Sequence, residues 1–353
     1  MGPDYKPQLD SLRAVAMAGV LYVHFWNTSP VLEGVRVALF FVLSGYLITR
    51  MLLRARGLDR WRTIRNFYAR RLLRLQPALL IMLAIAAAYN FEHIRATFLW
   101  HVFQLSNFLF ILQRSFDPWV TAHLWSLNVV EQFYAFWPLV ILFLPFRALW
   151  LAVAVMILAA IAYTSSSFAN SDPTGITRDM FTLSGFDSIG LGAAISLIEA
   201  RKPGLLRPLG STWACTGALA VLLSPLAFGE DFWPGGTYEI VFPLTLAVIV
   251  AGACVGYRGF LKRMLENAPL LYLGRISYGI YIYHYLLLEF VFRWAPHLSA
   301  EVGPMRFFTA SAATVAAASL SWHLVEAPIA SLKRFFPVRG APSAQPVPSR
   351  DAT

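Results

Sequence analysis

The sequence predicts an all-α polytopic membrane protein, a helix bundle with about ten transmembrane helices. Hydrophobic residues make up 58% of the 353-residue chain and charged residues only 14%, and the mean hydropathy is +0.57. A single soluble core of this size could not bury so much apolar surface. Because no repeat or soluble domain interrupts the pattern, we expect one membrane domain over residues 1–336.

Apolar stretches recur along the whole chain, and each approaches the length of about 20 residues that a spanning helix needs. The first continues into "LYVHFW" without a small-residue cleavage site, so we interpret it as a retained helix rather than a removed signal peptide. The candidate segments are 9–27, 35–53, 75–92, 96–113, 124–146, 148–165, 179–199, 211–228, 238–256, 272–294 and 305–330.

The distribution of basic residues orients the bundle. Residues 50–74 contain nine arginines and one acid, Asp59, and the positive-inside rule places such a loop in the cytoplasm. If all eleven segments crossed, the basic loop 199–210 would face outward and the acidic loop 229–236 inward. Treating 96–113, the segment most interrupted by polar residues, as a re-entrant or surface-lying piece removes both conflicts. Ten helices then remain, with both termini in the cytoplasm.

The same topology places the remaining loops consistently. The basic positions near Arg201, Lys262 and Lys333 lie inside, and the loops of Asp172, Asp231 and Glu301 lie outside. Residues 337–353 are rich in Pro, Ser and Ala, which predicts a disordered cytoplasmic tail. Cys215 and Cys254 stand in apolar stretches without a metal-binding pattern and are expected to be buried thiols.

The net charge of +10 does not predict a nucleic-acid partner, because most of the excess lies in the cytoplasmic loops, where it orients the helices and meets anionic membrane lipid. Residues 50–74 nevertheless hold nine arginines and no lysine, more than orientation requires. The guanidinium fork suits phosphate oxygens. Both a phosphorylated ligand and a lipid headgroup fit this pattern.

The first segment, "LDSLRAVAMAGVLYVHF", keeps ionisable residues where they are costly, and such residues mark functional sites in membrane proteins. Arg13 and His24 are eleven residues apart, so they fall within about 20° of one helical face and about 16 Å apart along the axis. One face therefore offers an anion anchor and a titratable base. The alternatives are an interfacial arginine for Arg13, an interhelical hydrogen bond for His24, and a helix cap or a pair with Arg13 for Asp10.

Other polar residues are expected at membrane depth. For Glu131 a structural and a functional role are equally consistent with the sequence. Asp187 lies among glycines that suit a close helix crossing. His284 lies among tyrosines and is interpreted as a packing histidine. Glu326 falls at the cytoplasmic end of the last segment, level with Arg13. An ion pair between Arg13 and Glu326 is the simplest structural explanation.

Six ordered motifs carry a resemblance to a known family: "LDSLRAVAMAGVLYVHF", "FFVLSGYLIT", "FYARRLLRLQP", "HLWSLNVVEQFYAFWP", "SYGIYIYH" and "VEAP". Through them the chain resembles the acyltransferase-3 family of bacterial integral-membrane O-acyltransferases, from about residue 9 to residue 330. The resemblance implies a location in the bacterial cytoplasmic membrane. It also implies transfer of an acyl group, commonly acetyl from cytoplasmic acetyl-CoA, to a hydroxyl of a sugar, glycan, lipid-linked sugar or secondary metabolite.

The resemblance also implies roles for individual residues. Arg13 and His24 match the family's essential Arg–His pair, Arg71 and Arg74 its Arg-x-x-Arg motif, and Glu326 its late acidic position. Two positions depart from the pattern. Val130 replaces the first of two glutamates and weakens any role for Glu131, and no arginine directly precedes Asp187.

Two mechanisms are consistent with these residues. His24 could act as general base on the acceptor hydroxyl, or it could be acylated and pass the group on. In both, we expect Arg70, Arg71 and Arg74 to bind the CoA phosphates and Arg13 to orient the donor or pair with Glu326. No metal is expected.

Two further questions stay open from the sequence. His123, Trp125 and Trp119 are predicted near the outer face, where they could shape an acceptor cleft, although an interfacial aromatic belt is the simpler interpretation. The alternative function is a proton-coupled transporter or a flippase of lipid-linked sugars. The absence of a visible internal repeat argues against it.

Overall fold

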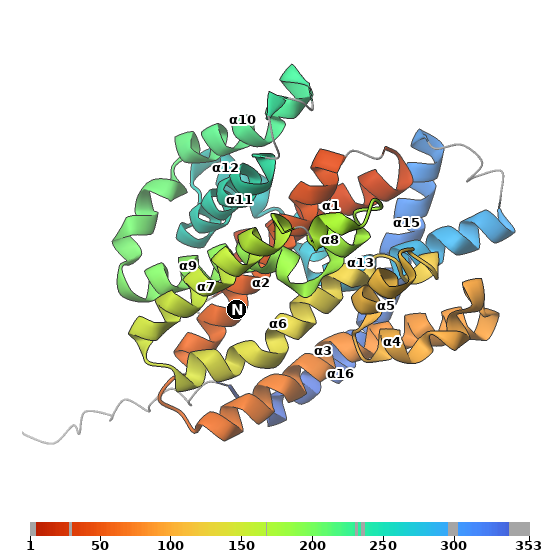
Figure 1. Ribbon diagram of the computed structural model, residues 1–353, viewed down its shortest axis with the longest axis horizontal. Coiled ribbons are helices and arrows are strands. Elements are labelled where there is room, and N and C mark those ends of the chain that lie inside the picture. The colour runs from red at the N-terminus through yellow and green to blue at the C-terminus, as the bar shows by residue number, and fades with distance from the viewer. Residues whose placement is uncertain are drawn as a thin grey trace, which may run out of the picture.

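The computed structural model describes residues 5–27, 30–166, 168–229, 232–233, 237–295 and 303–338. Within these ranges every regular element is a helix (Figure 1), which confirms the all-α bundle. Asp231, Glu301 and residues 339–353, for which outer loops and a disordered tail are predicted, lie outside the described residues. The long helices are α1 (Pro7–Phe25), α2 (Pro30–Arg54), α3 (Arg60–Tyr89), α6 (Leu124–Phe143), α7 (Phe146–Thr164), α9 (Phe186–Arg201), α10 (Thr212–Phe228), α11 (Tyr238–Val255), α13 (Ala268–Trp294) and α15 (Pro304–Ser321).

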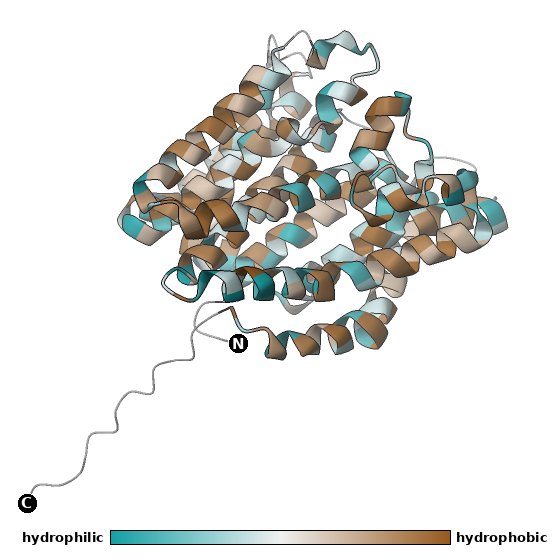
Figure 2. Cartoon of the chain, turned by 60° about the horizontal axis from the view of Figure 1, so that its bottom comes forward, coloured by the Kyte–Doolittle hydropathy of each residue, from teal (hydrophilic) through white to brown (hydrophobic). Residues whose placement is uncertain are grey.

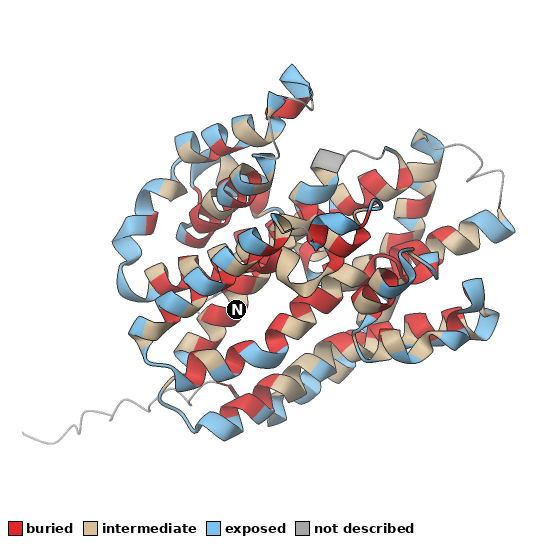
Figure 3. Cartoon of the chain, viewed as in Figure 1, coloured by how far each residue is buried: buried red, intermediate tan, exposed pale blue. Residues whose placement is uncertain are grey.

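The outer helices present apolar side chains on the surface of the bundle, as expected for a multi-pass membrane protein. Leu158 on α7 is 63% exposed, Leu226 on α10 69% and Leu320 on α15 62%. Figure 2 shows hydrophobic residues along the helices at the surface of the bundle, and Figure 3 shows the exposed positions of the chain. A monomeric soluble protein rarely exposes so much contiguous apolar surface.

By length and composition, seven helices of the described chain are apolar enough to cross a membrane, or eight if η5 (Pro203–Gly210) and α10, bent by 71°, form one span. Helices α1 and α13 are not among them. Both are long enough to span, but ionisable and tyrosine side chains interrupt them. Since polar residues inside a membrane domain are retained for function, these two helices are where a site is expected.

The structure breaks the demoted segment 96–113 into two short helices, α4 (Phe98–Val102) and α5 (Ser106–Gln113). Gln104, between them, has a φ of 60°. Three polar residues of the segment, His101, Ser106 and Asn107, are fully buried. The backbone N–H of Asn107 donates to Asn128 of α6, and its side chain donates to the carbonyl oxygen of Met180. The segment is therefore a broken helix packed against α6 by hydrogen bonds and is not one of the long helices.

Segments far apart in sequence meet at one end of the bundle. Lys6 forms an ion pair with Glu199 at 3.0 Å, and the Gln8 side chain donates to Glu266 at 2.9 Å. The guanidinium of Arg70 donates to the carbonyl oxygen of Lys333 at 3.0 Å. The ends and loops that the charge pattern assigns to the cytoplasm therefore share one side of the molecule.

Glycines bring α2 and α9 into backbone contact. A Cβ on Gly45 would lie 2.0 Å from the carbonyl oxygen of Ile189, and one on Gly192 would lie 2.0 Å from that of Val42. Such small residues allow membrane helices to approach closely. The close crossing expected around Asp187 is thus present, and Gly192 takes part in it.

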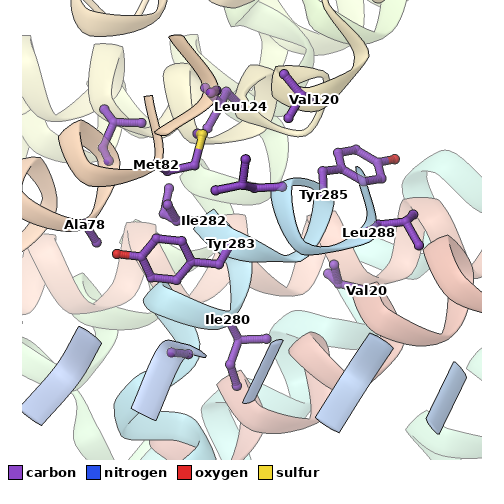
Figure 4. Packing of buried hydrophobic residues seen from close by; sticks show 14 of the residues in the cluster. Val20, Ala78, Met82, Val120, Leu124, Ile280, Ile282, Tyr283, Tyr285 and Leu288 are labelled. Atoms are coloured by element: carbon purple, nitrogen blue, oxygen red, sulfur yellow. The ribbon is translucent and has the colours of Figure 1, made fainter. Parts of the chain in front are cut away.

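A second close contact joins α1 to α13. A Cβ on Gly274 would lie 2.0 Å from the carbonyl oxygen of Asp10. Above this contact, apolar residues of α1, α3 and α13 form one core cluster, in which Val20, Met82 and Ile280 are each at most 2% exposed (Figure 4). This packing fixes the relative position of α1 and α13, the helices that carry the two histidines described below.

We predict that Gly192→Ala destabilises the bundle, because the new Cβ meets the backbone of α2 and not a movable side chain. Overpacking of this kind costs about 1–3 kcal/mol. The thermal unfolding temperature of the detergent-purified protein should fall. Gly217→Ala on α10 is the matched control, since nothing lies within 4 Å of its Cβ position. Equal unfolding temperatures for the two variants would contradict the prediction.

Candidate active site

A cavity of about 310 Å³ opens at the end of the bundle that holds Lys6 and Lys333. Among its described lining residues are six cationic side chains and one acidic side chain. A space with this charge attracts a polyanion, and guanidinium groups favour phosphate oxygens. It is lined by Asp10, Arg13, Met51, Phe67, Arg70, Arg71, Arg74, Gly274, Arg275 and Lys333.

Helix α3 supplies the arginines of this cavity in a fixed register. It begins after Asp59, whose side chain accepts a hydrogen bond from the backbone N–H of Arg62. Arg74 follows Arg70 by four positions and Arg71 by three, so the three side chains emerge on one side of the helix. The guanidinium of Arg71 lies 4.2 Å from the centre of the Tyr134 ring. This stacking holds Arg71 in place while its N–H donors stay available.

The second group of polar residues lies near the far end of α1. His24 Nδ1 is 2.9 Å from Nε2 of His284 on α13, and the two ring planes are within 5° of parallel with centroids 5.0 Å apart, so the rings meet edge to edge. On its other side, His24 Nε2 is 2.9 Å from Nη2 of Arg36 on α2. His284 is fully buried and Arg36 is 7% exposed. Tyr285 stacks on the His24 ring at 4.6 Å and completes the enclosure.

A larger cavity, of about 950 Å³, opens on the opposite end from the cationic cavity. Glu33, one of its lining residues, accepts a hydrogen bond from Arg36 at 3.0 Å, so the cavity borders the histidine cluster. Arg178 and Glu239 form an ion pair in its wall. Asp179 and Asp187 add two more carboxyl groups, and Trp125 and Phe41 supply aromatic surface. The two cavities therefore differ in charge.

Comparison with known proteins gives the chain its family. The profile of the acyltransferase-3 family, described as an acyltransferase domain, matches residues 6–323. The chain belongs to the acyltransferase-3 family. No solved structure matches it significantly.

Several relatives of this family member are named as O-acetyltransferases. The chain is 30% identical to the peptidoglycan O-acetyltransferase OatA of Listeria monocytogenes over 92% of its length. It is 32% identical to the putative peptidoglycan O-acetyltransferase YrhL of Bacillus subtilis, also over 92%, and 28% identical to a putative O-acetyltransferase of Staphylococcus aureus. It covers 56%, 55% and 57% of these proteins, respectively, so it spans little more than half of their length.

The structure of this acyltransferase-3 member brings most of the expected residues to two places. Arg13, Arg70, Arg71 and Arg74 all line the cationic cavity. His24 lies in the histidine cluster instead, in agreement with the axial separation expected from their spacing. Arg13 and His24 therefore share one face of α1 but belong to two sites, the cationic cavity and the histidine cluster, and not to one pocket.

The expected ion pair between Arg13 and Glu326 is not formed. Arg13 pairs with Asp10 at 2.8 Å, as its spacing of three residues allows. Glu326 accepts from the Ser321 hydroxyl at 3.0 Å and is 4% exposed. The reason is local: residues Trp322–Glu326 form a π-helical turn, which shifts Glu326 from the register of a regular helix.

Arg70 is also used differently from expectation. Its guanidinium donates to the carbonyl oxygens of Lys333 at 3.0 Å and Phe336 at 3.3 Å. Asn66, one turn earlier, donates to the carbonyl oxygen of Pro337 at 2.7 Å. Arg70 therefore lines the cavity while it holds the C-terminal segment against α3, and Arg71 and Arg74 are the better placed for a ligand.

Two residues of the cluster were missed by sequence reasoning. His284 was interpreted as a packing histidine, yet it is a hydrogen-bond partner of His24. For Arg36 the sequence patterns predict no role. Its position in the sequence could have indicated a role. Arg36 lies near the end of α2 that is opposite the basic loop, where the positive-inside rule does not favour an arginine.

The aromatic residues near His24 also depart in part from expectation. His123 is 4% exposed, and its ring lies 4.7 Å from that of His284, so it does not belong to an interfacial belt. Trp125 lines the larger cavity, whereas Trp119 is 47% exposed and contacts Tyr285. The described residues contain no group of His, Cys, Asp or Glu that could hold a metal ion.

Proposed function

We propose that this chain is an O-acetyltransferase of the bacterial cytoplasmic membrane. It would move an acyl group, acetyl in the first instance, from cytoplasmic acyl-CoA to a hydroxyl of a glycan, lipid-linked sugar or small-molecule acceptor. The observation that carries the proposal is the arrangement of two cavities of unlike charge on either side of a buried histidine cluster. Family membership agrees with it.

In this proposal the cationic cavity receives the CoA phosphates. Arg71 and Arg74 bind them directly, and Arg275 and Lys333 add positive charge to the same wall. Arg13, held by Asp10, orients the donor at the inner end of α1. Glu326 lies within electrostatic range of Arg74 and Lys333, and its role is to balance their charge.

His24 is the catalytic residue of the proposal. Its ring is about 16 Å along α1 from the level of Arg13, a separation that the extended arm of CoA is suited to bridge. As general base, His24 takes the proton of the acceptor hydroxyl while the hydroxyl oxygen bonds to the acyl carbon and the carbon–sulfur bond breaks. As nucleophile, it would carry the acyl group itself. Both versions use the same ring nitrogen.

The larger cavity is the proposed acceptor site. Two of the relatives are named for peptidoglycan, so a cell-wall glycan is the first acceptor class to test. The charge of the cavity restricts the choice of acceptor further. Glu33 and Glu239 form ion pairs with arginines, whereas Asp179 and Asp187 form none among the described residues. Carboxylates at a binding surface repel anions, so the acceptor is an uncharged or amino sugar.

The function is tested by release of free CoA thiol from acetyl-CoA by detergent-purified protein, with and without a panel of hydroxylated acceptors. We expect acceptor-dependent release by the wild type and its loss in His24→Ala, because general-base or nucleophilic catalysis contributes about 10²-fold or more. Absence of release with every acyl-CoA donor would refute the proposal and favour a transporter.

Arg74→Ala should raise the KM for acetyl-CoA by about tenfold or more, since a charge-assisted contact to phosphate contributes about 1.5–3 kcal/mol. The kcat at saturating donor should change little. Arg65→Ala is the control, because Arg65 is an exposed arginine of the same helix outside the cavity. If both variants raise KM equally, the cavity is not the donor site.

The acceptor class is tested with a matched pair of oligosaccharides, one neutral and one in which a sugar is replaced by its uronic acid. The wild type should have the higher kcat/KM for the neutral member, because its cavity already holds Asp179 and Asp187. Asp179→Asn should reduce the difference in kcat/KM between the neutral oligosaccharide and the one that contains the uronic acid. Preference for the uronic acid would overturn this assignment.

A further inference from the structure

The hydrogen bonds around His24 determine which of its nitrogens carries the proton. An arginine guanidinium has donors only, so Nε2 of His24, 2.9 Å from Nη2 of Arg36, must be the acceptor. A neutral imidazole has one acceptor nitrogen and one N–H. The hydrogen of His24 is therefore on Nδ1, and it is donated to Nε2 of His284 at 2.9 Å.

The position of the hydrogen on His284, at the other end of this series of hydrogen bonds, is determined in the same way. Because Nε2 of His284 accepts from His24, its own hydrogen is on Nδ1. Nδ1 lies 2.6 Å from the backbone carbonyl oxygen of Tyr281, which can only accept. An obligate donor at one end and an obligate acceptor at the other thus leave one tautomer for each histidine.

These tautomers determine which side of the molecule the basic nitrogen of His24 faces. Its single basic atom, Nε2, points toward Arg36, and the other hydrogen on Nη2 of Arg36 is donated to Glu33 at 3.0 Å. Glu33 lines the larger cavity. The lone pair of His24 therefore faces the side from which the acceptor would enter, and the N–H faces the interior of the bundle.

We propose that His284 is a positioning residue that holds the hydrogen of His24 on Nδ1, so that Nε2 is the reacting atom. The proposal rests on the proposed function. When the acceptor binds, Arg36 releases Nε2 and remains paired with Glu33. The acceptor hydroxyl proton moves to Nε2 as the new carbon–oxygen bond forms and the carbon–sulfur bond breaks, and the proton then passes to the departing CoA sulfur.

A packing role for His284 would depend only on its shape, whereas the proposed role depends on an acceptor atom facing Nδ1 of His24. The difference can be tested with two substitutions. In His284→Gln the side-chain oxygen reaches the position of the lost Nε2 and accepts the same hydrogen bond. In His284→Phe an aromatic ring is kept beside His24 and the acceptor nitrogen is removed.

With an acceptor that the wild type uses, we expect His284→Phe to lower kcat by about 10²-fold with an unchanged KM for acetyl-CoA. Once Arg36 has released Nε2, no acceptor atom remains to hold the hydrogen of His24 on Nδ1, and the wrong tautomer removes base catalysis without affecting the donor site. His284→Gln should recover most of the kcat. The unfolding temperature and acetyl-CoA binding of the Phe variant serve as the folding control. Equal loss in both variants, or full activity in His284→Phe, would overturn the proposal.

A second measurement separates this proposal from the proposed function. Nitrogen-15 NMR of histidine-labelled wild type, with the His24 signals assigned by their loss in His24→Ala, reports the tautomer without turnover. We expect a protonated Nδ1 and an unprotonated Nε2. The reverse tautomer would refute the role of His284 even in an active enzyme, whereas an inactive wild type with the expected tautomer would refute the acetyltransferase assignment alone.

Discussion

The requirement that buried polar atoms be paired organises the centre of this protein. Arg36, His24 and His284 come from three helices and lie where water is scarce, so each depends on the next for a hydrogen-bond partner. The chain of contacts ends on a backbone carbonyl of α13 and on the carboxylate of Glu33. Any displacement of α1, α2 or α13 would leave one of these groups unpaired, which couples the position of the helices to the chemistry of His24.

Helix α1 links two environments that are kept apart. Its first turns contribute Asp10 and Arg13 to the cationic cavity, and its last turn holds His24 beside the acidic one. In the proposed function, an anionic donor and a hydroxylated acceptor would thus meet surfaces of opposite charge. This separation would give each cavity its own selectivity, and only the reacting groups would need to approach the histidine cluster.

The parts of this arrangement that lie on one helix could be predicted from the sequence. The spacing of Arg13 and His24 on α1, and that of Arg71 and Arg74 on α3, follows from helical periodicity. The partners of His24 could not be predicted in this way, because periodicity indicates which face a residue occupies and not which helix it meets. Arg36 lies on α2, and His284 is 260 residues away from His24.

The hydrogen-bond partner of Glu326 could not be predicted for another reason. The π-helical turn at Trp322–Glu326 shifts the register of the last helix just before the acid. A turn of this kind has no clear sequence signature here. The segment 96–113 was correctly separated from the long helices because its polar residues interrupt the apolar run, although their burial against α6 required the structure.

The backbone contact of α2 with α9 limits how the molecule can move. Gly45 and Gly192 leave no space between the helices, so neither can rotate past the other without clashes or voids. Helix α2 carries Arg36 near one end and Met51, in the wall of the cationic cavity, near the other. A transporter that opens its binding site alternately to the two sides of the membrane needs such helices to move relative to each other. In the proposed function only the acyl group has to pass between the two cavities, so these two helices can keep their backbone contact throughout.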